Sequence, residues 1–145
     1  MGGKIHIKEI SLKMKLGTVM GEVYNHVYDK AQEFFLRYDL TCHQYGVVLI
    51  LSNSSVPLST SDILKKMPEK NSGVSRMVDR LILKGLVEKV TNSKDKRLVD
   101  IQLTLKGKKL YEEIEKHIFE IDNIYSSVTE EEAKLLIDLL SKLKG

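Results

Sequence analysis

The sequence predicts a mainly α-helical fold with one small β-hairpin. Apolar residues recur at the 3.6-residue spacing of a half-buried helix over about 7–38 and again from Thr104 towards the end of the chain. Between these regions, a shorter helix predicted at 72–84 is followed directly by two strand-like runs, 87–92 and 99–104. The chain has 145 residues, of which 42% are hydrophobic and 30% charged, so it is long enough to form one domain with a buried core.

The first two helices have clear predicted limits. One long helix is expected over about 7–38, and Gly17 and Gly21 are the points at which it could be interrupted. Thr41 and Gln44 have the spacing of a capping box, in which the threonine hydroxyl accepts a hydrogen bond from the amide three residues on and the glutamine reaches back. A second helix is therefore predicted to begin at Thr41.

Two further helices have the pattern of a helix-turn-helix. Ser59 is predicted to cap a short helix with Asp62 in its first turn, and Pro68 forces that helix to end. The helix at 72–84 follows after a tight turn. Its apolar positions are 74, 77, 78, 81 and 82, and its opposite face carries Ser72, Ser75, Arg76, Asp79 and Arg80.

The exit from this helix leads straight into the hairpin. Gly85 stands where a left-handed residue is needed after a helix, and Leu86 is placed to contact Leu81 across the helix end. The hairpin tip, residues 93–98, reads Ser-Lys-Asp-Lys-Arg-Leu. A half-buried helix with a polar and basic outer face suits a DNA major groove, and a basic hairpin beside it suits the phosphates and the minor groove.

Charge is distributed unevenly along the chain. The net charge is +3, but residues 60–110 contain 13 Lys/Arg and 6 Asp/Glu, whereas residues 111–145 contain 4 and 9. The positive charge therefore coincides with the predicted helix-turn-helix and hairpin, where it would attract a polyanion. A charge run by itself is more often a solvated surface, so the asymmetry counts only together with these motifs.

The ends of the chain are too apolar to be free tails. Thr104 begins a second long helix, and Thr129 with Glu132 forms another capping box before a leucine-rich last helix. Amphipathic helices of this kind need a surface to pack on, and a second copy of the chain is the simplest one.

Several classes of protein are excluded or disfavoured by the sequence. No apolar run reaches the roughly 20 residues of a membrane span, and the N-terminus has no signal-peptide core, so neither membrane insertion nor export is expected. A single cysteine, Cys42, excludes an internal disulfide framework and fits the cytoplasm. There is no glycine-rich phosphate loop, nucleophile elbow or metal-binding signature, so no enzyme activity, metal or cofactor is expected.

The order and spacing of several motifs carry a resemblance to a known family. These motifs are Leu40-Thr41 with Gln44-Tyr45, Leu58-Ser59, Val74 to Leu81, Lys84 to Val87, Asp95-Lys96-Arg97, and Ile101 to Thr104 with Gly107. The collinear set, between about residues 10 and 143, resembles the MarR family of bacterial and archaeal transcription regulators.

The resemblance implies a single domain over 1–145, with a winged helix-turn-helix DNA-binding lobe at about 40–105. It implies that the helices at about 5–38 and 107–145 form a homodimer. It also implies that the helix at 72–84 enters the major groove and the wing tip the minor groove. Members of the family usually repress genes from a pseudo-palindromic operator, and they are often released by a small ligand or by oxidation.

The candidate DNA-binding residues lie on the polar helix face or in the wing, and they are Ser72, Ser75, Arg76, Arg80, Lys94, Asp95, Lys96 and Arg97. Arg76 and Arg80 have the chemistry to bind a guanine edge or a phosphate. By resemblance, Arg97 enters the minor groove and Asp95 orients it. Solubilising arginines and a solvated turn are the alternatives. Gly73 departs from the family pattern, so no operator preference is carried over at this position.

Two further sets of residues are weaker candidates. Tyr24, His26, Tyr28 and Tyr45 could line the ligand pocket that the resemblance places between the dimerisation helices and the DNA-binding lobe, although core or interface positions are the favoured interpretation. Cys42 lies at the start of a predicted helix, whose dipole would lower the thiol pKa. Oxidation sensing is nevertheless disfavoured, because the peroxide-sensing branch of the family has its cysteine in the first helix, where this chain has none.

The sequence therefore predicts a cytoplasmic, sequence-specific DNA-binding transcriptional regulator. The expected form is a homodimeric repressor of a pseudo-palindromic operator. Its expected partners are double-stranded DNA, a second copy of itself and an unidentified small-molecule effector, with no membrane. The alternative is a winged-helix protein-interaction module without specific DNA binding, against which the retained Arg76, Arg80 and Arg97 argue. An enzyme is the least favoured interpretation.

Overall fold

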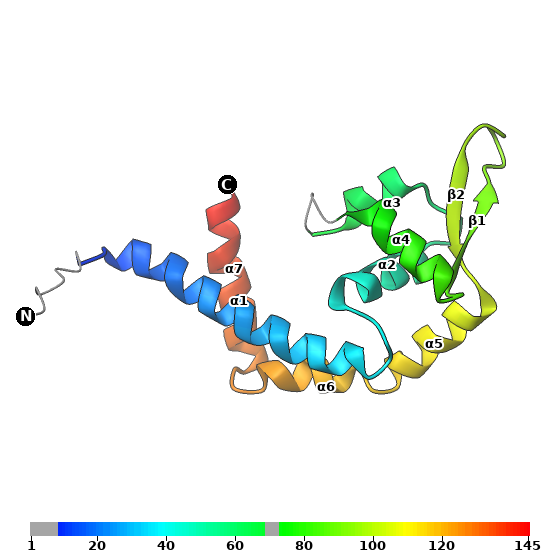
Figure 1. The fold of residues 1–145 in the computed structure, drawn as a ribbon. Helices are drawn as coiled ribbons and strands as arrows, with labels where there is room; N and C mark the ends of the chain where they lie inside the picture. Colours follow the sequence, from blue (N-terminus) through cyan, green and yellow to red (C-terminus); the bar gives the residue numbers. More distant parts are fainter. Residues whose placement is uncertain (1–8, 69–72) are drawn as a thin grey trace, which may run out of the picture.

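The computed structural model describes residues 9–68 and 73–145 and is mostly helical, with one antiparallel hairpin in which Val87 lies opposite Leu103 (Figure 1). The elements in chain order are α1 (Leu12–Leu36), α2 (Cys42–Ser52), α3 (Thr60–Lys66), α4 (Val74–Leu83), β1 (Val87–Thr91), β2 (Val99–Leu103), α5 (Leu105–Glu115), α6 (Phe119–Asp122), η1 (Asn123–Tyr125), α7 (Glu130–Ser141) and η2 (Lys142–Lys144). The predicted fold class is confirmed. No helix in the described part of the chain is long and apolar enough to cross a membrane.

The elements form a lobe and a set of helices beneath and beside it (Figure 1). The lobe consists of α2, α3, α4 and the β1–β2 hairpin, whereas α1 and α6 run side by side before the chain turns back into α7. The most deeply buried side chains come from every element of the lobe, from the α1–α2 turn and from α5, and they are Leu40, Val47, Val48, Ile63, Val78, Leu81, Val87, Ile101 and Ile114. The lobe and α5 therefore share one hydrophobic core.

α1 runs without interruption for 25 residues. It begins at Leu12, where the hydroxyl of Ser11 accepts a hydrogen bond from the backbone N–H of Met14 at 3.1 Å. The helix therefore starts later than the sequence predicted. It passes straight through Gly17 and Gly21, so the suggested interruption is wrong. A single glycine lowers helix propensity by only about 1 kcal/mol and does not by itself end a helix.

Capping boxes begin both α2 and α3. The Thr41 hydroxyl accepts from the Gln44 amide at 3.1 Å, and the Gln44 side chain accepts from the Thr41 amide at 3.2 Å. Ser59 and Asp62 form the same reciprocal pair at 3.0 and 3.3 Å. α3 then ends before Pro68, as predicted, since proline cannot continue the helix.

A glycine with a left-handed backbone lies at each end of α4. Gly73 is the N-cap, with a φ of 63°, and makes no side-chain cap hydrogen bond. At the other end Gly85 has a φ of 74°, and its N–H donates to the Ile82 carbonyl at 2.9 Å. The N–H of Leu86 donates to the Leu81 carbonyl at 3.0 Å. These two bonds make the predicted left-handed helix end, known as a Schellman motif.

α5 packs closely against the end of α4. The hydroxyl of Thr104 caps α5 by accepting from the Gly107 amide at 3.1 Å, and the backbone N–H of Thr104 donates to the Leu86 carbonyl at 3.0 Å. A Cβ atom added at Gly107 would overlap that same carbonyl oxygen. Glycine at this position therefore allows the two backbone segments to meet.

The single long helix predicted after Thr104 is instead divided into α5, α6 and η1, so that prediction is wrong. Between α5 and α6 the N–H of His117 donates to the Ile114 carbonyl at 2.9 Å, and the N–H of Glu120 donates to the His117 carbonyl at 3.0 Å. These bonds span three residues instead of four and tighten the helix. Arg37, the C-cap residue of α1, binds the Glu120 carboxylate at 2.7 Å, so an ion pair joins the end of α1 to α6 just after this turn.

Replacing Gly107 with alanine is expected to lower the free energy of unfolding by about 1–3 kcal/mol or more, because the added methyl group must displace the Leu86 backbone. Urea or thermal unfolding measures the change. The matched control is G46A in α2, where the added Cβ would meet the Met67 side chain at an ordinary 3.5 Å, so this variant should be neutral or stabilised. Equal stability of the two variants would contradict the close packing of α5 on α4.

Candidate nucleic-acid interface

α4 buries one face and exposes the other, as its sequence predicts. Val74, Val78 and Leu81 are in the core, and Met77 and Ile82 are half-buried. The opposite face exposes Ser75, Arg76, Asp79 and Arg80. Ser72, the first of the predicted contact residues, lies outside the described part of the chain. The helix thus presents two arginines four residues apart on one exposed face.

The wing presents its arginine in a fixed orientation. Both oxygens of the Asp95 carboxylate accept hydrogen bonds from the Arg97 guanidinium, from Nε and Nη2, each at 3.0 Å. These bonds hold the pKa of Asp95 below its usual value and raise the pKa of Arg97. The Arg97 side chain is 89% exposed. An exposed ion pair adds little to the free energy of folding, so the main effect of this pair is to orient the Arg97 side chain.

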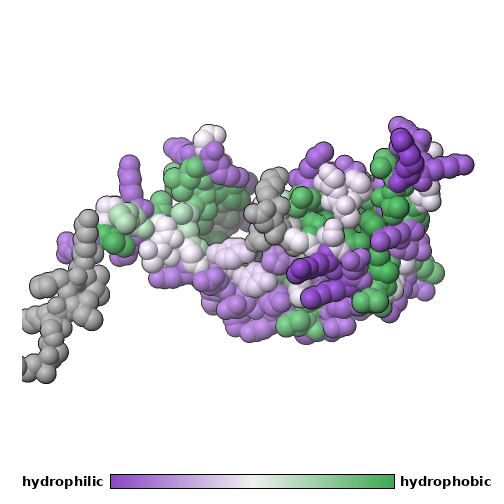
Figure 2. Space-filling view, turned by 45° about the horizontal axis from the view of Figure 1, so that its top comes forward, coloured by the Kyte–Doolittle hydropathy of each residue, from purple (hydrophilic) through white to green (hydrophobic). Residues whose placement is uncertain are grey.

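Lys94 and Lys96 complete the basic wing tip, and both are exposed. Figure 2 shows hydrophilic side chains gathered at the end of the hairpin. The structure therefore places the predicted wing residues together at one projecting tip and the predicted helix residues on α4 of the same lobe.

Two residues that organise the wing tip were missed in the sequence. Asn92 accepts the backbone N–H groups of Lys94 and Asp95, each at 2.9 Å, and donates its side-chain amide to Asp100 at 2.8 Å. The signal for Asn92 was available, since asparagine often hydrogen-bonds the backbone two residues on at the start of a turn. Asp100 gave no such local signal, because its contact with Asn92 depends on the hairpin register.

The C-terminal end of α4 is tied to the segment that follows the hairpin. The ammonium group of Lys106 donates to the Lys84 carbonyl at 2.8 Å, and the Thr104 hydroxyl donates to the Gly85 carbonyl at 2.6 Å. These bonds satisfy carbonyl groups that a helix end otherwise leaves without partners. The segment before the wing, at the end of α4, and the segment after it, at the start of α5, are therefore hydrogen-bonded to each other.

Lys84 connects this end of α4 to the α1–α2 turn. Its ammonium group donates to the Asp39 carbonyl and to the side-chain oxygen of Gln44, the latter at 3.2 Å, and lies 3.7 Å from the Asp39 carboxylate. Gln44 is only 4% exposed, and the same oxygen also serves the α2 capping box. A cation at a helix C-terminus is favourable, so Lys84 both stabilises α4 and fixes it to the turn.

Comparison with known proteins finds relatives of one kind. The model of the MarR family matches residues 40–99. An uncharacterised HTH-type transcriptional regulator from Bacillus cereus is 30% identical over 115 residues, which are 78% of this chain and 76% of that protein. This chain belongs to the MarR family. Its predicted resemblance is thereby confirmed.

Two other relatives align over shorter segments. The HTH-type transcriptional regulator BilQ from Clostridium symbiosum is 40% identical over 70 residues, 48% of this chain and 49% of BilQ. The HTH-type transcriptional repressor MdtR from Bacillus subtilis is 40% identical over 57 residues, 39% of this chain and 37% of MdtR. The aligned part of the chain thus spans half or less of the length of these two proteins. All these relatives are named as transcriptional regulators and not as enzymes, in agreement with the sequence analysis.

Solved structures share the fold of this MarR-family chain. A MarR-like transcription regulator from Bacillus cereus superposes with a TM-score of 0.79 at 26% identity, over 91% of this chain and 95% of that one. A mutant of MarR from Escherichia coli, solved in complex with operator DNA, superposes with a TM-score of 0.81 at 24% identity, over 92% and 99%. The winged helix-turn-helix architecture is therefore confirmed.

The four residues suggested for a ligand pocket do not all lie in one place. Tyr24 and Tyr28 stack on α1 with ring centroids 5.9 Å apart, and His26 is exposed on the same helix. Tyr45 belongs to the core, where it stacks on Phe35 at 4.3 Å. Burial and a hydrogen bond to Glu115 raise the pKa of the Tyr45 hydroxyl well above its usual value. Tyr45 is thus a packing residue in this chain.

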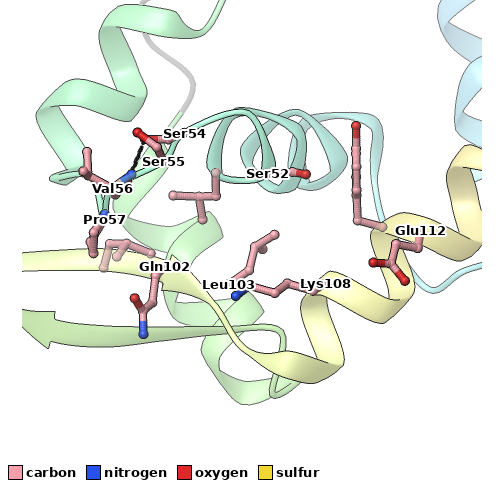
Figure 3. A pocket seen from close by; sticks show the side chains of 12 residues that line it. Ser52, Ser54, Ser55, Val56, Pro57, Gln102, Leu103, Lys108 and Glu112 are labelled. Atoms are coloured by element: carbon pink, nitrogen blue, oxygen red, sulfur yellow. Dashed lines mark hydrogen bonds between the residues drawn. The ribbon is translucent and has the colours of Figure 1, made fainter.

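A hollow of about 360 Å³ lies elsewhere, between α2, the loop that follows it, β2 and α5 (Figure 3). Figure 3 shows Gln102, Lys108 and Glu112 on one side of this hollow. The loop after α2 is shaped by Ser54, whose hydroxyl donates to the Val56 carbonyl at 2.6 Å and accepts from the Val56 N–H at 3.3 Å, the bond drawn in Figure 3. None of these residues was predicted from the sequence to form a site, because they come together only in the folded chain.

The structure places Cys42 at the start of α2, where its side chain is half-buried. Burial raises the pKa of its thiol, against the expectation that the start of α2 would lower it. The backbone N–H of Cys42 also donates to the side-chain oxygen of Gln32, in α1, at 2.8 Å. Among residues 9–68 and 73–145, no group of three His, Cys, Asp or Glu side chains is placed to hold a metal ion.

Proposed function

We propose that this MarR-family protein is a cytoplasmic, homodimeric transcriptional repressor that binds a pseudo-palindromic operator. The observation that carries the proposal is the pairing of two surfaces on one lobe. α4 exposes Ser75, Arg76 and Arg80, and the wing exposes Arg97 in a bidentate bond with Asp95. A helix with exposed arginines suits base edges in the major groove, and a projecting arginine suits a narrow minor groove.

The homodimer is supported by apolar surface outside the lobe. The N-terminal half of α1, α7 and the short η2 that follows it expose large apolar side chains at 38–84% of their full area, namely Leu12, Met14, Leu16, Val19, Met20, Val23, Leu135, Leu136, Ile137, Leu139 and Leu143. Apolar side chains gather over α7 in Figure 2. Exposed apolar side chains in this number indicate a partner, and a second copy of the chain offers the same apolar helices.

Release by a small-molecule effector would act on geometry. Two copies of α4 must lie about one turn of DNA apart, roughly 34 Å, to enter successive major grooves. A ligand that favours a different angle between lobe and dimerisation helices therefore lowers affinity without touching the DNA contacts. Lys84, which joins α4 to the α1–α2 turn, is a polar link through which such a change in angle would pass.

The DNA contacts are tested by a gel-shift titration against the intergenic DNA upstream of the protein's own gene, with competitor DNA and a salt series. R97A is expected to weaken binding by about 1–3 kcal/mol and to lower the salt dependence, while R76A should also change the sequence preference. K116A removes the same charge from the end of α5, away from the wing, and should bind like the wild type. Unchanged binding in R97A and R76A would contradict the site. Absence of any competitor-resistant shift would favour the protein-interaction module.

The dimer is tested by light scattering coupled to size-exclusion chromatography. The wild type is expected to have twice the 16.5 kDa mass of one chain. The double variant L136E/L139E places two charges on the apolar face of α7 and should give a monomer with much weaker operator binding. K134E on the same helix is the control and should remain dimeric. A monomeric wild type at micromolar concentration would refute the proposed assembly.

A further inference from the structure

The conformation of the wing tip depends on side chains that flank it. The side-chain oxygen of Asn92, at the end of β1, accepts the backbone N–H groups of Lys94 and Asp95, both at 2.9 Å. The side-chain amide of Asn92 donates to Oδ2 of Asp100, in β2, at 2.8 Å. Asn92 thus joins the tip to the paired part of the hairpin, using both ends of its side chain.

The next bonds along this chain of contacts lead to Arg97. The Asp95 carboxylate, whose own amide is held by Asn92, accepts the backbone N–H of Arg97 at 3.0 Å as well as both guanidinium bonds. Hydrogen bonds therefore run from Asp100 through Asn92 and Asp95 to Arg97. The exposed end of this chain of contacts is the arginine that we assign to the minor groove.

Asp100 is costly at its position, which indicates a specific role. It is only 9% exposed, and a carboxylate loses hydration free energy when it is buried. It also places a negative charge in a wing whose proposed partner is a polyanion. A hydrophobic residue would avoid both costs, but it would leave the amide of Asn92 without this acceptor.

We infer that Asn92 and Asp100 are positioning residues that hold the wing tip in the conformation presenting Arg97 to DNA. The effect on DNA affinity rests on the proposed DNA-binding function. The hydrogen bonds that Asn92 and Asp100 make are a property of the free protein. Neither residue needs to touch DNA. Their effect on affinity passes through the orientation of Asp95 and Arg97.

Two substitutions at Asp100 separate positioning from charge. D100A and D100N each remove one negative charge from the wing, which by itself would strengthen DNA binding. D100N keeps a side-chain oxygen that can accept from Asn92, whereas D100A does not. If only charge matters, the two variants bind alike and at least as tightly as the wild type. If positioning matters, D100A binds more weakly than D100N.

The experiment compares wild type, D100N, D100A and the charge-neutral N92A by gel shift on the upstream intergenic DNA and by hydrogen exchange of the Lys94 and Asp95 amides in the free protein. We expect D100A to bind DNA about five- to tenfold more weakly than D100N. We expect N92A to bind DNA more weakly than the wild type by about the same factor. Their Lys94 and Asp95 amides should exchange several-fold faster. Thermal melts confirm that each variant is folded, and N92A at a half-buried loop position serves if D100A does not fold.

The outcomes are distinct. Equal affinity and equal exchange in D100A and D100N, with N92A like the wild type, would overturn the inference. Faster amide exchange without weaker DNA binding would also overturn it, because the hydrogen bonds of Asn92 and Asp100 would then hold the wing tip without affecting DNA affinity. A wild type that fails to bind any DNA specifically would refute the proposed function, and the exchange data alone would then decide whether Asn92 and Asp100 hold the tip.

Discussion

The end of α4 is the point on which the rest of the structure depends. Its closing turn requires a left-handed residue, which Gly85 supplies. The Leu86 carbonyl that follows accepts a hydrogen bond from the Thr104 amide. The same carbonyl lies so close to Gly107 that a side chain there would overlap it. Only three residues, Lys84 to Leu86, separate the end of α4 from the start of β1. The short connection and the contact between α4 and β1 therefore set the direction in which the wing leaves the helix.

The end of α4 also connects the lobe to the long helices. Lys84 reaches from α4 to Asp39 and Gln44 at the α1–α2 turn, and Arg37 near that turn binds Glu120 of α6. These polar contacts join the end of α4 to the α1–α2 turn, and Arg37, beside that turn, to α6. In the proposed dimer two lobes must match the helical repeat of DNA, so a small change in the angle between α1 and the lobe would have a large effect on affinity. This arrangement explains how dimer geometry could control binding without altering the residues that contact DNA.

Local signals predicted the fold well because they depend on contacts within a few residues. The Thr41 capping box and the Gly85 helix end formed as these local signals predicted, and the wing pair of Asp95 with Arg97 formed as the resemblance to the MarR family implied. Features that depend on distant packing were missed. The turn between α5 and α6 keeps right-handed helical backbone angles, so the apolar spacing continues through it. The raised pKa of Cys42 follows from burial against the rest of the fold, and Asp100 meets Asn92 only through the hairpin register.

Dimethyl sulfate footprinting of the protein on its operator would test the central claim most directly, since the reagent methylates guanine N7 in the major groove and adenine N3 in the minor groove. Entry of α4 and the wing into neighbouring grooves predicts protected guanines in two tracts about one helical turn apart, with protected adenines beside each tract. Protection confined to one kind of groove, or without this spacing, would contradict the account.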